Sequence, residues 1–167
     1  MSRVELAVTP LAPVVVPGIP TGYHSSVMVD GEEFFFSDGG VGRSQDQASH
    51  RSYNNKTRVT AMGTTDKSKT QLLAALEPHF RAGTYDLLRK NCNSFSDCAL
   101  FFLLQKRLPR EYCALEGLGA SAPAALVRSV QGQYKPNPLA DGFSVDGVMR
   151  GLDPQRALRE AWGTPGR

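Results

Sequence analysis

The stretch YHSSVMVDGEEFFF, residues 23–36, constrains the fold most strongly, because it contains two β-prone runs on either side of Asp30-Gly31. Aspartate followed by glycine favours a two-residue hairpin turn in which both residues have positive φ. A turn this tight also fixes the register of the two strands. That register pairs Val29 with Glu32, Val27 with Phe34, and Ser25 with Phe36. The sequence therefore predicts an antiparallel hairpin here.

Further strands are expected on both sides of this hairpin. Alternating apolar residues predict a strand over residues 4–8, and the segment RVTAMGTT predicts another that begins at Arg58 and ends at Gly63. Residues 43–57 are polar and have no periodicity, so we expect an exposed loop there. Together with the helices below, these strands predict an α+β fold, a small antiparallel sheet packed against helices.

Two helices are expected after the strands. The first begins at a cap, Thr65 or Asp66, and ends at Gly83, with Pro78 kinking or shortening its last turn. The second follows YDLLRKNC and stops before Pro109. It carries a wide apolar stripe that consists of Phe95, Ala99, Phe102 and Leu103. Its N-terminus is expected at Asn91, Cys92 and Asn93.

The length of 167 residues leaves room for one domain with one core. We expect that domain over residues 1–113 and an extension of lower order over 114–167. The extension is expected to be partly helical, because SAPAALVRSV and DPQRALREAWG are candidates for short helices.

Composition excludes several classes of function. The formal net charge is +3 and the basic residues are scattered, so no nucleic-acid partner is expected. Four prolines interrupt the apolar stretch LAVTPLAPVVVPGIP, which predicts a strand and a loop rather than a signal peptide or a membrane span. The three cysteines show no pairing pattern, which indicates a reducing compartment, the cytoplasm or the nucleus. No zinc-ligand spacing is present, so neither a metal nor a cofactor is expected.

Cys92 is the candidate nucleophile because of its place at a helix start. The unpaired N–H groups and the positive dipole end favour a thiolate there, although only by about 0.3–1 kcal/mol. Something else must supply the rest, and a protonated imidazole in contact is the usual supplier. A cysteine beside a helix is otherwise most simply a small buried hydrophobe. We read Cys98 in that way, and nothing marks Cys113 as reactive.

His24 is the candidate partner among the three histidines. It lies inside a predicted strand and points to the face opposite Ser25, with Ser26 and Met28. A core histidine bonded to a carbonyl group remains the alternative for it. His50 lies in the polar loop and His79 late in the first helix, so both are expected to be solvated.

Three segments in this order resemble the PPPDE family, which comprises permuted papain-fold thiol peptidases and includes deSUMOylating isopeptidases. They are GYHSSVMVDGEEFFFSDGGV, GTTD and YDLLRKNCNSFSDCALFFLLQKRLP. The resemblance covers residues 4 to about 113 and departs from the family pattern at Ser37-Asp38, in the loop 43–57 and beyond Cys113. It implies a permuted papain-like fold in which the catalytic cysteine begins a helix.

The resemblance also implies site residues. It carries the catalytic histidine onto His24 and the nucleophile onto Cys92. No third residue matches an orienting Asn or Asp, so we infer a dyad, with Asp38 as the one candidate to test. Oxyanion or helix-start support is expected from Asn91 and Asn93, and the cleft wall from Tyr23, Gly39 and Gly40.

The resulting hypothesis is a cysteine isopeptidase that releases SUMO or ubiquitin from a substrate lysine. The Gly39-Gly40 pair would then border a groove narrow enough for a Gly-Gly tail. Two alternatives stay open. The same dyad could hydrolyse a palmitoyl thioester on acylated proteins, or the fold could be a catalytically silent binding module. The sequence leaves a homodimer possible in each case.

Overall fold

The computed structural model of the chain describes residues 1–11, 21–113 and 134–153. Its centre is a five-stranded antiparallel sheet in the order β4-β3-β2-β1-β5. The strands are β1 (Ser2–Pro10), β2 (Tyr23–Val29), β3 (Glu32–Ser37), β4 (Gly40–Gln45) and β5 (Arg58–Thr65). The predicted strands over 4–8 and 23–36 are confirmed, and the strand that begins at Arg58 runs two residues past its predicted end at Gly63, whereas β4 was not predicted.

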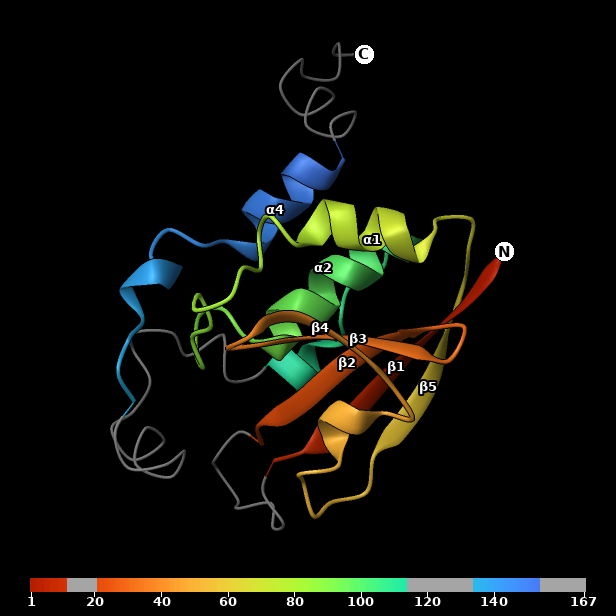
Figure 1. Cartoon of the computed structure of the whole chain (residues 1–167), viewed down its shortest axis with the longest axis horizontal. Helices are drawn as coiled ribbons and strands as arrows, with labels where there is room; N and C mark the ends of the chain where they lie inside the picture. The colour runs from red at the N-terminus through yellow and green to blue at the C-terminus, as the bar shows by residue number, and fades with distance from the viewer. Residues whose placement is uncertain (12–20, 114–133, 154–167) are drawn as a thin grey trace, which may run out of the picture.

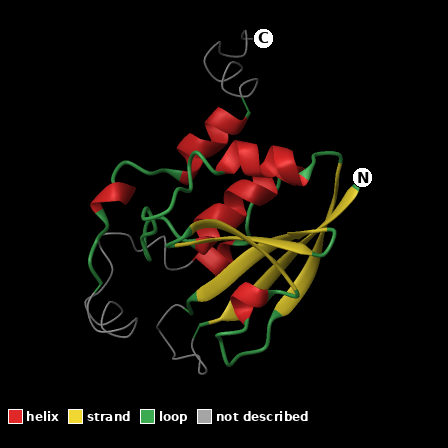
Figure 2. Cartoon of the chain, in the orientation of Figure 1, coloured by secondary structure: helices red, strands yellow, loops and turns green. Residues whose placement is uncertain are grey.

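The α-helices gather on one face of this sheet (Figure 1). They are α1 (Lys69–Leu76), α2 (Cys92–Leu104) and α4 (Val145–Leu152). Three short 3₁₀ helices complete the described elements: η1 (Ala48–His50), η2 (Arg110–Cys113) and η4 (Pro138–Ala140). Figure 2 shows η1 below the sheet, on the face away from α1 and α2. The predicted α+β class is therefore confirmed. Within the described part of the chain, no helix has the length and apolar character needed to cross a bilayer.

The β2–β3 hairpin closes with the predicted turn. Asp30 has φ 49° and Gly31 has φ 81°, the left-handed conformations that a two-residue hairpin of this type requires. The register pairs Val29 with Glu32 and Val27 with Phe34, as expected. The apolar side chains of the hairpin on the helix side, Val27, Val29, Phe34 and Phe36, are all buried in the core.

Helix α1 is shorter than predicted. Its N-cap is Ser68, not Thr65 or Asp66, because the Ser68 side chain accepts a hydrogen bond from the Gln71 N–H and the Gln71 Oε1 accepts one from the Ser68 N–H. The helix ends at Leu76, two residues before Pro78 and well before Gly83. Three apolar side chains of this segment are nonetheless buried: Leu72, Leu76 and Phe80.

Helix α2 is the central helix of the core. It is buried along almost its whole length, and Phe95, Cys98, Ala99 and Leu100 have no exposed surface. The predicted start is confirmed, since the N-cap is Asn91 and the first helical residue is Cys92. The helix ends at Leu104 rather than near Pro109, because Gln105 takes a left-handed conformation with φ 57°.

The described part of the C-terminal extension packs on the domain. Val148 and Met149 of α4 belong to the same hydrophobic cluster as α2. Asp86, in the loop that leads to α2, accepts hydrogen bonds from the Tyr134 hydroxyl and the Asn137 N–H. The helix predicted over 121–130 and most of the one predicted over 153–163 lie outside the described residues. The boundary at residue 113 stays a prediction.

Candidate active site

The site begins where the β2–β3 ladder ends. Strand β2 pairs with β1 along its whole length, from Tyr23 to Val29, but it pairs with β3 at only three positions, the last being Val27 with Phe34. The expected pair of Ser25 with Phe36 does not form. The first half of β2 therefore has no strand partner on its β3 side, and its backbone groups there must bond elsewhere.

The start of α2 supplies those bonds through Asn93. The Asn93 Nδ2 donates to the Tyr23 carbonyl oxygen over 3.1 Å, and the Asn93 Oδ1 accepts from the Ser25 Oγ over 2.7 Å. Tyr23 and Ser25 flank His24 in the chain. One asparagine thus ties the first turn of α2 to the residues on both sides of the candidate histidine.

Asn91 caps the same first turn of α2. Its Oδ1 accepts from the N–H groups of Asn93 and Ser94, and its Nδ2 donates to the Leu87 carbonyl oxygen over 2.8 Å. This is the N-cap arrangement that satisfies the first N–H groups of a helix. Both asparagine side chains therefore support the helix start, and the oxyanion alternative for them stays a prediction.

Cys92 is the first residue of α2 and lies against the peptide group that carries His24. Its Sγ is 3.9 Å from the Tyr23 carbonyl oxygen and 4.0 Å from the Asn93 Oδ1. Because the Tyr23 carbonyl belongs to the peptide bond between Tyr23 and His24, the fold brings the sulfur next to the His24 backbone. Only 5% of Cys92 is exposed.

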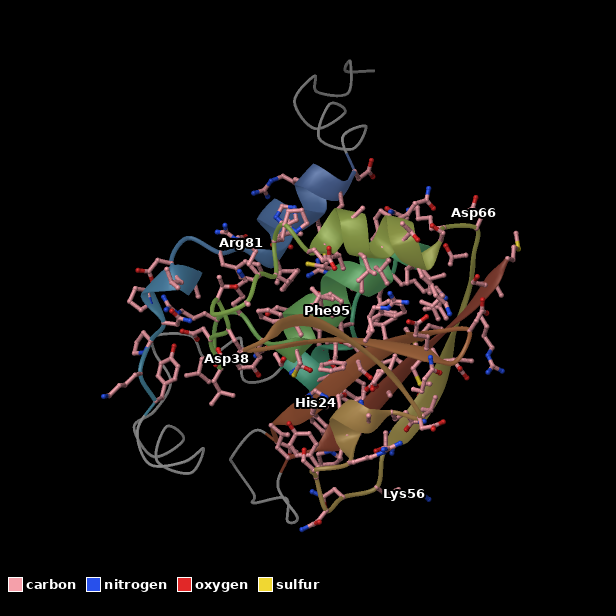
Figure 3. The ribbon with its side chains drawn as sticks, in the orientation of Figure 1. His24, Asp38, Lys56, Asp66, Arg81 and Phe95 are labelled. Atoms are coloured by element: carbon pink, nitrogen blue, oxygen red, sulfur yellow. The ribbon has the colours of Figure 1, made fainter. Side chains whose placement is uncertain are left out.

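His24 lies on the other face of the sheet, as its strand position predicts, beside η1 (Figure 3). Its Nε2 is 2.7 Å from the Ser49 Oγ, and its ring centroid is 4.5 Å from that of His50. Burial and then the neighbouring His50 lower its pKa to about 4, against an opposing effect of Glu33. The imidazole is therefore neutral at neutral pH. The partner of His24 is Ser49 and not Asp38, whose side chain is exposed in the β3–β4 turn.

The loop around η1 is partly buried, which corrects the expectation of an exposed, solvated segment. His50 is only 3% exposed, because its Nδ1 contacts the Thr9 Oγ1 over 2.8 Å and its Nε2 contacts the Ser26 Oγ over 2.9 Å. Glu33 is fully buried beside it. The hairpin register could have indicated Glu33, since it pairs with Met28 on the face of His24.

Two tyrosines that the sequence analysis did not single out lie near the sulfur. Burial, the charge of a Cys92 thiolate, the neighbouring Tyr53 and a hydrogen bond to Cys92 together raise the pKa of Tyr85. Burial and the same thiolate raise the pKa of Tyr53. The Tyr53 ring is also 5.1 Å from the His24 ring, so Tyr53 borders both candidate residues.

Comparison with known proteins identifies the family. The family model described as "PPPDE putative peptidase domain" matches residues 9–129, a span that includes both His24 and Cys92. The chain belongs to the PPPDE peptidase family. The predicted resemblance is thereby confirmed, and the α+β structure is consistent with this domain. The permuted papain-like arrangement stays a prediction.

A human protein named desumoylating isopeptidase 1 is similar to this PPPDE chain. The two are 31% identical over 91 residues, which is 52% of this chain and 53% of the human protein. The chain therefore spans about half the length of the curated relative that it matches.

The proposed cleft-wall residues of this PPPDE domain have well-defined surroundings. The Tyr23 ring packs edge-on against Tyr112 with 5.0 Å between centroids. Gly40 has φ 91°, and a Cβ there would lie 3.1 Å from the Ala82 backbone nitrogen, so glycine lets the turn approach the next loop closely. Gly39 is exposed in the same turn. Their role as a cleft wall stays a prediction.

A cavity of about 710 Å³ opens beside the helix start rather than over the sulfur. Asn93, Ser94 and Asp97 line it from α2, and Val145 and Asp146 line it from α4. Two arginines that line it are paired with carboxylates, Arg107 with Asp97 and Arg89 with Asp141. Among the described residues, no group of three or more His, Cys, Asp or Glu side chains is arranged to hold a metal ion.

Proposed function

We propose that this chain is a cysteine isopeptidase that hydrolyses the amide bond between a ubiquitin-like modifier and a substrate lysine. Cys92 is the nucleophile and His24 the proton carrier. Membership of the PPPDE family supports a peptidase, and similarity to a protein named desumoylating isopeptidase 1 supports the class of substrate. One observation carries the proposal most directly: the Cys92 sulfur lies at the first turn of a capped helix, 3.9 Å from the carbonyl oxygen that precedes His24.

The reaction follows the chemistry of acyl transfer. The Cys92 thiol gives its proton to the neutral His24 imidazole as the sulfur attacks the carbonyl carbon of the modifier's last residue. The C–N bond then breaks, and His24 returns the proton to the departing lysine amine. Water attacks the thioester, loses a proton to His24 and releases the modifier as a carboxylic acid. His24 finally reprotonates the Cys92 thiolate.

Because the His24 imidazole is neutral at pH 7, it acts first as a base and then, once protonated, as an acid. A group with a pKa near 4 is almost entirely unprotonated at pH 7, so it can accept the thiol proton without first losing one. The developing oxyanion would receive the backbone N–H of Cys92 at the positive end of α2. The hydroxyl of Tyr85, whose pKa Cys92 helps to raise, is the second donor that we propose.

Reaction with electrophilic modifier probes tests the proposal. SUMO and ubiquitin that end in an alkylating group should form a covalent adduct with the parent chain, and Cys92→Ala should abolish it. Cys98→Ala is the matched control, since Cys98 is fully buried further along the same helix, and its adduct should match the parent. His24→Gln should slow adduct formation strongly.

Three outcomes would contradict the proposal. Labelling of Cys92→Ala would show that another cysteine reacts. Hydrolysis of an acyl-thioester substrate, with no reaction towards either modifier, would favour the thioesterase alternative. Binding of a modifier tail without any turnover or adduct would favour a silent binding module.

A further inference from the structure

A buried carboxylate lies beneath His24. Glu33 has no exposed surface, and serine hydroxyls surround it. The Ser49 Oγ donates to the Glu33 Oε1 over 2.5 Å, the Ser49 N–H donates to the Oε2 over 3.2 Å, and the Ser44 hydroxyl also donates to the Oε2. Burial by itself would raise the pKa of Glu33, but hydrogen bonds from Ser44, Ser49 and Ser26 outweigh it and lower that pKa. Glu33 is therefore an ionised acceptor at neutral pH.

This carboxylate determines which ring nitrogen of His24 carries the proton. A serine hydroxyl has a single hydrogen, and the hydrogen of Ser49 is donated to Glu33. The Ser49 Oγ can then only accept from the His24 Nε2, 2.7 Å away. Nε2 must therefore be protonated, and in a neutral imidazole that leaves Nδ1 with the lone pair.

Nδ1 is also the ring nitrogen nearer the His24 backbone. It is bonded to the ring carbon that joins the side chain to Cβ, so it lies nearer the His24 backbone than Nε2 does. The Cys92 Sγ lies against that backbone, 3.9 Å from the Tyr23 carbonyl oxygen. The nitrogen with the lone pair is therefore the one nearer the backbone that the sulfur approaches, and the protonated nitrogen is held by Ser49.

We propose that Ser49 and Glu33 are positioning residues that hold His24 as its Nε2–H tautomer and so present Nδ1 to Cys92. The His24 Nε2–H donates a hydrogen bond to Ser49, and Ser49 donates one to Glu33. Two hydrogen bonds thus connect the imidazole to the carboxylate. A serine and a glutamate would together serve where an orienting Asn or Asp was sought from the sequence. The catalytic consequence rests on the proposed function, whereas the tautomer does not.

The same carboxylate holds the neighbouring histidine in place. The His50 Nε2 lies 2.9 Å from the Ser26 Oγ and 3.4 Å from the Glu33 Oε1. His50 is therefore bonded to its own serine and does not compete for Ser49. Its ring, 4.5 Å from that of His24, limits the positions that the His24 imidazole can take.

Nitrogen-15 NMR of the imidazole rings tests the tautomer directly and needs no substrate. The parent chain at pH 7 should show His24 with a protonated Nε2 and an unprotonated Nδ1. Ser49→Ala should shift His24 towards a mixture of tautomers, and Ser49→Thr, which keeps the hydroxyl, should restore the parent spectrum. A parent chain with the proton on Nδ1, or a Ser49→Ala spectrum identical to that of the parent, would overturn the proposal.

Rates of adduct formation and hydrolysis test the consequence for the reaction. Ser49→Ala should lower kcat by roughly 10- to 100-fold with little change in KM, since positioning partners commonly have effects of this size. Glu33→Gln should act in the same direction. Ser44→Ala is the matched control, because it also removes one hydroxyl from Glu33 but no contact with His24, and its kcat should stay within about 3-fold of the parent.

Equal losses of kcat in Ser49→Ala and Ser44→Ala would overturn the proposal, because they would indicate a general effect on the Glu33 carboxylate rather than an effect on the position of His24. Failure of the proposed function looks different. In that case the parent chain would not react with any modifier probe, while the His24 spectrum would still respond to Ser49→Ala.

Discussion

Acidification from pH 7 to pH 5 is expected to destabilise the folded chain, because His24 must stay neutral in the fold. Its pKa is lowered from 6.5 to about 4, by burial first and then by the neighbouring His50. Between those values the unfolded chain binds a proton at this position and the folded chain does not. The free energy of unfolding therefore falls as pH falls through this range, and the loss is complete only below about pH 4.

The two pKa values set the magnitude. A difference of 6.5 against about 4 corresponds to a total loss of about 3 kcal/mol, of which about 2 kcal/mol appears between pH 7 and pH 5. His50, whose pKa is lowered by burial against an opposing effect of Glu33, adds to the loss in the same direction. Carboxylates such as Glu33 contribute mainly below pH 5, because their unfolded-state pKa is near 4.5.

Urea denaturation at pH 7 and pH 5 measures this loss for each variant separately. His24→Gln removes the titrating ring but keeps an amide nitrogen that can donate to Ser49. Its loss of stability between the two pH values should be about 2 kcal/mol smaller than that of the parent. His79→Gln is the matched control, because His79 is exposed after α1, and its loss should equal that of the parent. The same loss in His24→Gln as in the parent would refute the reasoning.

Further predictions concern the helix start and the β3–β4 turn. Iodoacetamide should alkylate Cys92 roughly ten-fold faster than Cys98, because burial raises the pKa of the fully covered Cys98 thiol. Peptide mass spectrometry measures the order of modification, and Cys98 modified first would contradict this prediction. Asn91→Ala should lower the free energy of unfolding in urea by about 1–2 kcal/mol, and Asn91→Ser, which can still cap α2, by less. Gly40→Ala should lower the thermal midpoint, because an alanine at φ 91° carries a backbone strain of about 1–3 kcal/mol. Gly39→Ala, in ordinary backbone, should leave the midpoint nearly unchanged, and equal shifts in the two variants would argue against strain.

Local chemistry made the hairpin and the start of α2 predictable from the sequence. The Asp30-Gly31 turn has a fixed geometry, and it set the register of Val27 and Val29 without any tertiary information. Asn91 before an apolar run likewise indicated a helix that begins at Cys92, and the structure has that helix. Both features depend on residues that lie close together in the sequence.

Tertiary contacts decided the features that were missed. His50 lies in a polar segment without periodicity, and it is buried by contacts with residues far along the chain, among them Thr9 and Ser26. Helix α4 was missed as well, although Val148 and Met149 pack into the main core. Ser49 was missed for the same reason as His50. Its proposed role depends on contacts with Glu33 and His24, which the sheet brings next to it.

The short β2–β3 ladder is what makes a site possible in so small a sheet. A ladder continued past Ser25 and Phe36 as far as Tyr23 would have satisfied the Tyr23 carbonyl with a strand and closed the space that the helix start now occupies. Because pairing stops at Val27, Asn93 can reach the unpaired carbonyl, and the Cys92 sulfur is drawn to the peptide group before His24. The alternation of side chains along β2 then places His24 above the buried Glu33 while its neighbour Ser25 faces α2. The same interruption therefore gives the sulfur its position at the unpaired edge of β2, while the imidazole has a polar, buried support on the face away from α2.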